Sequence, residues 1–194
     1  MIYLLLGLIV FLGVHSISIV APNWRDAMLA RMGEGAWKGL YSVISIMGFV
    51  LLVWGYGQAR MEAVVLYNPP VWTRWIAAVL LLPVFPLLLA PYFPGRIKAA
   101  LKHPMLVAVK IWALAHLIAN GTSADVLLFG GFLAWAVLDR ISLKRRPQRP
   151  IPALPPRAFN DVITVVLGLA LYFLFMHWLH ARWIGVSPMP LMSS

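Results

Sequence analysis

The sequence predicts an all-α membrane protein: a polytopic bundle of about six transmembrane helices with both chain termini outside the cytoplasm. Composition is the first reason, because 62% of the 194 residues are apolar and only 11% are charged. Soluble domains average about 45 to 50% apolar and about 25% charged residues. A soluble domain of this length would expose large apolar patches, so the surface is expected to face lipid. The spacing of the charges and their distribution among the loops supply the other two reasons.

The gaps between charged residues define the first three crossings, since a helix needs about 20 residues to cross the hydrocarbon layer. No charge precedes Arg25, which predicts a first helix over residues 2–20, retained and not cleaved as a signal peptide. The second and third crossings each fill a gap of 21 uncharged residues, between Lys38 and Arg60 and between Arg74 and Arg96. Prolines in the third crossing are expected to kink it.

Three further apolar segments complete the count. The fourth is expected over Pro104–Ala119, where the turn dipeptide Asn120-Gly121 ends it, and the fifth over Ser123–Asp139. The sixth is expected over Val162–Ala181. The fourth and fifth are short, so residues 104–139 either span the bilayer twice or form a re-entrant hairpin covered by protein. The sequence leaves both arrangements open.

Lys and Arg are retained on the cytoplasmic side of a membrane, and their distribution predicts the orientation. They concentrate in the loops at 21–38, 95–103 and 139–161. The opposite loops and the tail hold only Arg60, Arg74 and Arg182. This topology accounts for the net charge of +10, so no nucleic-acid partner is expected.

A basic, proline-rich stretch suggests a division of the chain into a transmembrane part (1–146), a cytoplasmic linker (147–158) and a last helix with a short tail (159–194). The stretch is most simply a solvated linker that fixes topology. Anionic lipid headgroups are the alternative ligands, held by Lys144, Arg145, Arg146 and Arg149.

Ionisable residues at membrane depth are candidates for function. His15 lies in the first helix and His116 in the fourth, while His103 lies near an edge. Imidazole is a common haem ligand, and helix bundles bury haem between facing side chains, so the histidines suggest a haem cofactor. An interhelical hydrogen bond is the simpler alternative for each histidine. His177 and His180, beside Trp178 and Trp183, are expected to be interfacial anchors.

Depth and charge pairing add two expectations. With about 1.5 Å of rise per residue, His15 lies roughly 9 Å and His116 roughly 18 Å from the cytoplasmic ends of their helices. Depth alone would pair His15 with His103, and His116 with His177, equally well. Lys110 and Asp139 are expected to form a structural ion pair inside the bundle.

Four blocks of the sequence closely resemble the NnrU family of integral membrane proteins, over residues 1 to about 146. They are FLGVHSISIVAP (11–22), RMGEGAWKGLYSVIS (31–45), PGRIKAALKHPMLVAVKIWALAHLIANG (94–121) and FLAWAVLDRISLKRR (132–146). The family is linked to nitrite and nitric oxide reduction in denitrifying bacteria, and its relatives include the haem b enzyme 15-cis-zeta-carotene isomerase. The isomerase resemblance places haem-ligating histidines at His15 and His116. The isomerase has a cysteine at the position that corresponds to Ala113 of this chain.

Three functions are considered. The first, which the resemblance implies, is a haem b protein of the bacterial inner membrane that serves nitrogen-oxide respiration, with a denitrification reductase or an electron donor as partner. The second is haem-dependent cis–trans isomerisation of a carotenoid or another isoprenoid. The third is a non-catalytic membrane factor for assembly or transport, in which the histidines are structural.

Overall fold

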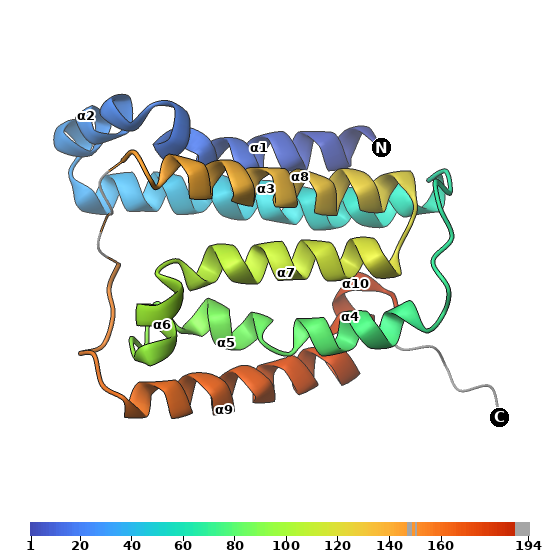
Figure 1. Cartoon of the computed structure of the whole chain (residues 1–194). Helices are drawn as coiled ribbons and strands as arrows, with labels where there is room; N and C mark the ends of the chain where they lie inside the picture. Colours follow the sequence, from blue (N-terminus) through green and yellow to red (C-terminus); the bar gives the residue numbers. More distant parts are fainter. Residues whose placement is uncertain (147–148, 150, 189–194) are drawn as a thin grey trace.

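The structure is a computed structural model that describes residues 1–146, 149 and 151–188, and these residues form an α-helical bundle (Figure 1). Within those ranges the β-structure is limited to an isolated bridge between Val65 and Thr122. The helices are α1 (Ile2–Val20), α2 (Pro22–Met32), α3 (Glu34–Met61), α4 (Thr73–Leu81), α5 (Val84–Leu89), α6 (Arg96–Leu101), α7 (Pro104–Ala119), α8 (Ser123–Ser142), α9 (Phe159–Leu174) and α10 (His180–Ile184), with a π-helical turn at Phe175–Leu179 between the last two.

Helix α7 is central to the bundle. Helices α1, α3 and α8 lie on one side of it, and α4, α5 and α9 lie on the other (Figure 1). This arrangement places His116 of α7 in the interior, where it can meet side chains from both sides.

Helices α1 and α3 pack closely because glycines let their backbones touch. A Cβ atom at Gly7 would lie 2.5 Å from the Leu52 Cα, and one at Gly55 would lie 2.5 Å from the Leu4 nitrogen. Small residues at such contacts are typical of membrane helices, whose association depends on close packing. This close packing fixes the relative positions of His15 on α1 and Tyr56 on α3.

The third predicted crossing is broken, as its prolines led us to expect. Helix α4 ends at Leu81 and α5 begins at Val84, with Pro83 between them, because proline cannot donate the next helical hydrogen bond. Gly168 of α9 lies against Pro86, where a Cβ atom would come within 2.4 Å of the proline nitrogen. The Tyr172 hydroxyl donates to the Ala78 carbonyl at 2.8 Å, so both halves of the broken helix are fastened to α9.

Apolar helices with exposed faces fit a lipid bilayer environment. In the described part of the chain, three helical segments are long and apolar enough to cross a membrane: Ile2–Val20, Glu34–Met61 and Phe159–Ile184. At most 22% of the most apolar window of each is buried within the protein. The remaining apolar surface needs lipid.

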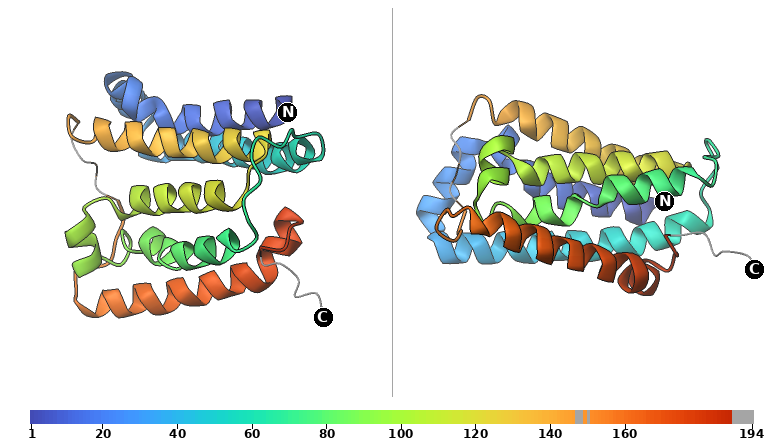
Figure 2. Two further views of the ribbon diagram at one scale, coloured as in Figure 1. Left: turned by 45° about the vertical axis from the view of Figure 1, so that its right-hand side comes forward. Right: turned by 60° about the horizontal axis from the view of Figure 1, so that its bottom comes forward.

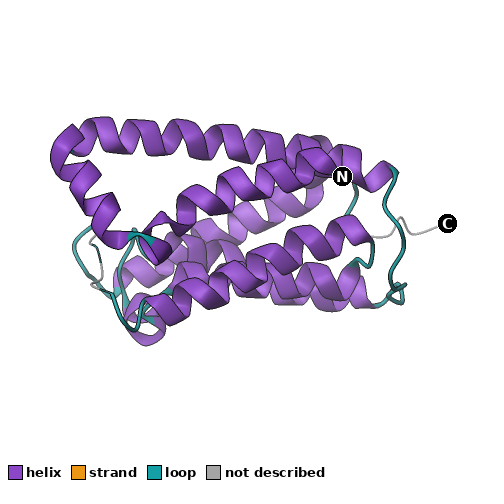
Figure 3. Ribbon diagram, turned by 90° about the horizontal axis from the view of Figure 1, so that it is seen from above, coloured by secondary structure: helices purple, strands orange, loops and turns teal. Residues whose placement is uncertain are grey.

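Loops gather at the two ends of the bundle (Figures 2 and 3). Helices α2 and α6 and the linker at 151–158 lie at one end, called here the basic end, and the N-terminus and the loop at 62–72 lie at the other. The turn at Asn120-Gly121 also lies at this other end, because Leu66 N donates to Gly121 O at 2.8 Å and Ser123 N to Val64 O at 2.8 Å. Helices α7 and α8 therefore run from one end to the other. The six crossings and their orientation remain predictions.

Candidate functional site

His15 is fixed by its own helix. Its Nδ1 lies 2.6 Å from the Phe11 carbonyl oxygen, which can only accept a hydrogen bond, so Nδ1 carries the proton. The Nε2 atom then has a free lone pair. The ring lies against Phe11 at 4.3 Å, Tyr41 at 5.4 Å and Trp135 at 6.1 Å between centroids.

His116 repeats this arrangement on α7. Its Nδ1 lies 2.8 Å from the Trp112 carbonyl oxygen, so Nε2 is again the acceptor. Phe129 of α8 stacks on the imidazole at 4.5 Å, and the Trp112 ring lies 5.2 Å away. In both histidines the Nδ1 proton is committed to the carbonyl four residues earlier, the orientation that metal-ligating histidines usually have.

A chain of aromatic rings connects the two histidines. The Phe11 ring, beside His15, lies 5.7 Å from Phe132, and Phe132 lies 5.3 Å from Trp112, beside His116. Within the described residues no ring contact or hydrogen bond joins His15 directly to His116. Their neighbours Trp135 and Phe129 are six residues apart on α8, about 9 Å along the axis at ~1.5 Å per residue. This spacing places the two histidines at different levels along the bundle.

The buried Trp135 Nε1, whose ring contacts that of His15, has no hydrogen-bond partner within the described residues. Buried polar groups are almost always paired, so the His15 side of the ring chain can hold a further group with an acceptor atom.

A buried carboxylate lies on the other side, near His116. Asp125 accepts hydrogen bonds from the Tyr56 hydroxyl at 2.6 Å and from the Thr122 nitrogen and hydroxyl at 2.9 and 2.7 Å. Thr122 caps α8 through a capping box with this same aspartate. The aspartate therefore joins α3 to α8 next to the Phe129 ring that stacks on His116.

Arg60 and His180 also lie near the Tyr56–Asp125 pair and His116, which the sequence did not indicate. The Arg60 guanidinium lies 5.3 Å from the Tyr56 ring and donates to the Ile184 carbonyl of α10 at 3.2 Å, while its Nε is buried with no partner. His180 donates Nδ1–H to the Val186 carbonyl at 2.7 Å and is close enough to His116 to interact with it electrostatically. We expected His180 to be an interfacial anchor.

The π-helical turn explains the position of His180. Residues Phe175–Leu179 insert an extra residue into the helical repeat, and α10 then turns away from the line of α9 toward the middle of the bundle (Figure 1). Such turns often occur at functional sites, and composition gives no signal of them.

The remaining histidines lie elsewhere. His103 precedes α7 at the basic end, 13 residues before His116 on the same helix axis, which is about 20 Å at ~1.5 Å per residue. The two cannot ligate one ion. His177 is exposed, with its ring stacked on Phe173 at 6.3 Å. In the described ranges no cluster of three or more His, Cys, Asp or Glu side chains could hold a metal ion.

The expected ion pair between Lys110 and Asp139 is replaced by another. Asp139 pairs with Arg146, and the Arg146 guanidinium also donates to the Ser18 carbonyl at 3.3 Å. No ion pair joins Lys110 to Asp139 in the part of the chain that the structure describes. The reason is that α8 ends at Ser142 and the turn after it brings Arg146 back over the helix end.

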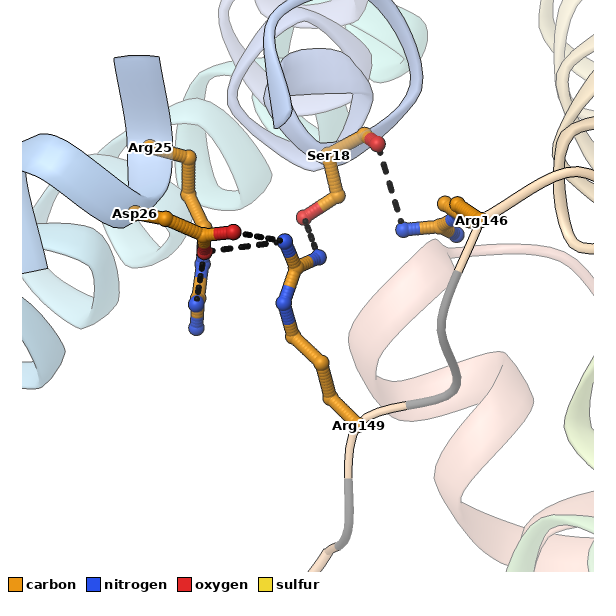
Figure 4. A network of polar contacts seen from close by, with 5 residues as sticks. All are labelled: Ser18, Arg25, Asp26, Arg146 and Arg149. Carbon is orange, nitrogen blue, oxygen red and sulfur yellow. Dashed lines mark hydrogen bonds and ion pairs between the residues drawn. The ribbon is translucent and has the colours of Figure 1, made fainter. Parts of the chain in front are cut away.

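Arg149 extends the same network (Figure 4). It donates to the Ser18 hydroxyl at 3.1 Å and to Asp26 at 3.0 Å, and Asp26 also accepts from Arg25 at 2.8 Å. Two of the four side chains considered for anionic lipid, Arg146 and Arg149, thus fasten the linker to the corner between α1 and α2. The other two, Lys144 and Arg145, are exposed.

Fold and site together define a helical protein of the membrane type that carries imidazole groups among apolar helices. The family model described as NnrU protein matches residues 3–188, so the chain belongs to the NnrU family. The match extends past residue 146, where the resemblance seen in the sequence ended, and it includes α9 and α10. No curated protein and no solved structure matched the chain in the corresponding comparisons.

Proposed function

We propose that this NnrU-family protein binds haem b within the membrane, that His116 is one iron ligand and that His15 or His180 is the other. The observation that supports the proposal is the shared geometry of the two imidazoles. Each donates Nδ1–H to a helix carbonyl and presents an unprotonated Nε2, the atom that binds haem iron.

The residues around the histidines are aromatic and apolar, as those around a buried haem are. Rings of Phe11, Trp112, Phe129 and Phe132 lie between the two histidines. The Trp135 Nε1, which has no partner within the described residues, offers a donor beside His15. A haem held by these histidines would supply a one-electron redox centre.

The second ligand of the iron at His116 has two candidates. His15 is the one that the resemblance implies, and the ring chain separates it from His116. His180, beyond the bend before α10, is the other, because its charge acts on His116. Two histidine ligands would give a six-coordinate iron suited to electron transfer.

Haem content of purified variants tests the proposal. We expect His116→Ala to lose the Soret band, His15→Ala to lose it or to change the spin state of the iron, and the exposed His177→Ala to match the wild type. A changed spectrum in His180→Ala together with an unchanged one in His15→Ala would assign the second ligand to His180. Full haem content in all four variants would refute the proposal.

We place this haem protein in the reduction of nitrite or nitric oxide, on its membership of the family. A deletion strain complemented with the wild type should recover growth on nitrite, and one complemented with His116→Ala at equal protein level should not. Equal growth of the two strains would assign the histidine a purely structural role.

No feature of the described residues favours isomerisation. Ala113, at the position of the isomerase cysteine, is 0% exposed within the core and carries no ligand atom. The chain therefore has no second ligand at this position to exchange with His116.

A further inference from the structure

A cavity of about 730 Å³ lies at the basic end, between α6 and the linker. The side chains of Lys98 and Lys102 line it, and the remaining lining residues are small or apolar, among them Ala99, Ala153 and Leu154. None of the described residues that line it carries a carboxylate. The cavity thus combines two amines with an apolar wall.

Hydrogen bonds hold the walls of this cavity in place. Leu154 N donates to Tyr92 O at 3.0 Å and Arg157 N to Pro94 O at 3.1 Å, which fixes the linker opposite α6. Asp161 of α9 accepts from Arg96 N at 2.8 Å and from Ile97 N at 3.1 Å, so the nearest carboxylate is occupied with the first turn of α6. The Asp161 carboxylate lies against Gly95 at the edge of the cavity, and no acidic side chain is among the described residues that line it.

The conformation of the lysine segment points the same way. Lys102 is the one non-glycine residue in the described ranges with a positive φ, 59°, a conformation that usually marks a constrained site. The Lys98 amine has only a long contact, 3.4 Å to the Pro91 carbonyl. Burial lowers the pKa of the neighbouring His103, and Arg140 and Lys102 lower it further, as expected beside clustered cations.

An apolar groove lies next to the cavity, on the other side of α6. It has a volume of about 420 Å³ between α5 and α9, and Leu87, Ile97, Val165 and Leu169 are among its lining residues. Ile97 lines the groove and Lys98, the next residue, lines the cavity. Consecutive residues of α6 thus line a basic cavity and an apolar groove.

We propose that these two features form one binding site for an anionic phospholipid, with its phosphate at Lys98 and Lys102 and an acyl chain in the groove between α5 and α9. Basic pockets at the cytoplasmic side of helix bundles bind the headgroups of such lipids. The site differs from the stretch Lys144–Arg149, where Arg146 and Arg149 are already paired within the chain. It does not depend on haem.

Titration of phosphatidylglycerol into protein held in phosphatidylcholine-containing micelles tests this site, with the thermal unfolding midpoint as the readout. The wild type should be stabilised, and Lys98→Gln and Lys102→Gln should each weaken the apparent affinity by roughly fivefold. The double variant Lys144→Gln/Arg145→Gln removes two positive charges outside the cavity, one more than either single variant, and should keep wild-type affinity. Leu169→Trp, which fills the groove, should weaken binding with both lysines intact.

Three results would overturn the proposal. One is stabilisation by phosphatidylcholine equal to that by phosphatidylglycerol. Another is an equal loss of affinity in the Lys144→Gln/Arg145→Gln control, which would show only general attraction to charge. The third is full stabilisation by inorganic phosphate alone, which would assign the cavity to a free phosphate instead of a lipid.

Discussion

Within the described residues, Tyr56 is the only residue of another helix that donates a hydrogen bond to the Asp125 carboxylate. Removing it leaves one side of a buried carboxylate unpaired, which costs about 1–3 kcal/mol. We therefore predict that Tyr56→Phe lowers the thermal unfolding midpoint in detergent. Tyr3→Phe, an exposed tyrosine whose ring rests on Trp54, is the matched control and should leave the midpoint unchanged. Equal midpoints for both variants would contradict the role of the Tyr56–Asp125 bond.

Asp26 reports on the network that fastens the linker. A hydrogen bond from Arg25, first, and the charge of Arg149 hold the pKa of this carboxyl below its ordinary value of 3.8. The stabilising contact is thus fully present above pH 3.8 and is lost as the pH falls through the lowered pKa. An NMR titration should show the pKa of Asp26 rising most in Arg25→Gln, less in Arg149→Gln and not at all in Lys38→Gln. An unchanged pKa in Arg149→Gln would place Arg149 away from Asp26 in solution.

At the scale of the helix, contact between α1 and α3 depends on glycines at particular places. We predict that Gly55→Ala destabilises the protein by about 1–3 kcal/mol, because the added Cβ meets the backbone of α1 at 2.5 Å. Gly57→Ala on the same helix has open space around it and should be neutral or slightly stabilising. Thermal unfolding of the pair is the measurement. Similar values for the two variants would show that α1 and α3 do not pack as described.

Helix ends and breaks could be predicted wherever a local rule acts. Charge gaps and turn residues gave α1 and α7 the bounds that the structure has, Ile2–Val20 and Pro104–Ala119, and prolines gave the break at Pro83. The π-helical turn before His180 could not be predicted, since nothing in Phe175–Leu179 distinguishes it from an α-helix. The short helices α2 and α6 were also missed, because loops were treated only as carriers of charge.

The residue types of the candidate site could be predicted from the sequence, but the contacts that these residues make could not. The histidines of α1 and α7 stand out because few ionisable residues occur at membrane depth, and the axial offset between them followed from the rise of a helix. The predicted partner of Asp139, Lys110, was wrong. The turn after α8 brings Arg146 to Asp139 instead, and the spacing of charges along a helix does not predict that turn. The proximity of His180 to His116 depends in the same way on a change of chain direction.

The whole molecule has loops at two ends, and the distribution of charge predicts which end faces the cytoplasm. The chain contains no cysteine, so single cysteines report their side of the membrane without background. Cysteine at the exposed position Asn68 should react with an impermeant maleimide on intact spheroplasts, and cysteine at the exposed Lys144 only after permeabilisation. The reverse pattern would invert the orientation. Equal labelling at both positions in intact cells would contradict a crossing between them.

The most direct test of the account is the optical spectrum of the purified wild-type protein, oxidised and then reduced, after production with an adequate supply of haem. We predict a Soret band, reduced α and β bands of a b-type haem and a stoichiometry near one haem per chain. The absence of haem from folded protein would contradict the account and leave His15 and His116 as structural side chains.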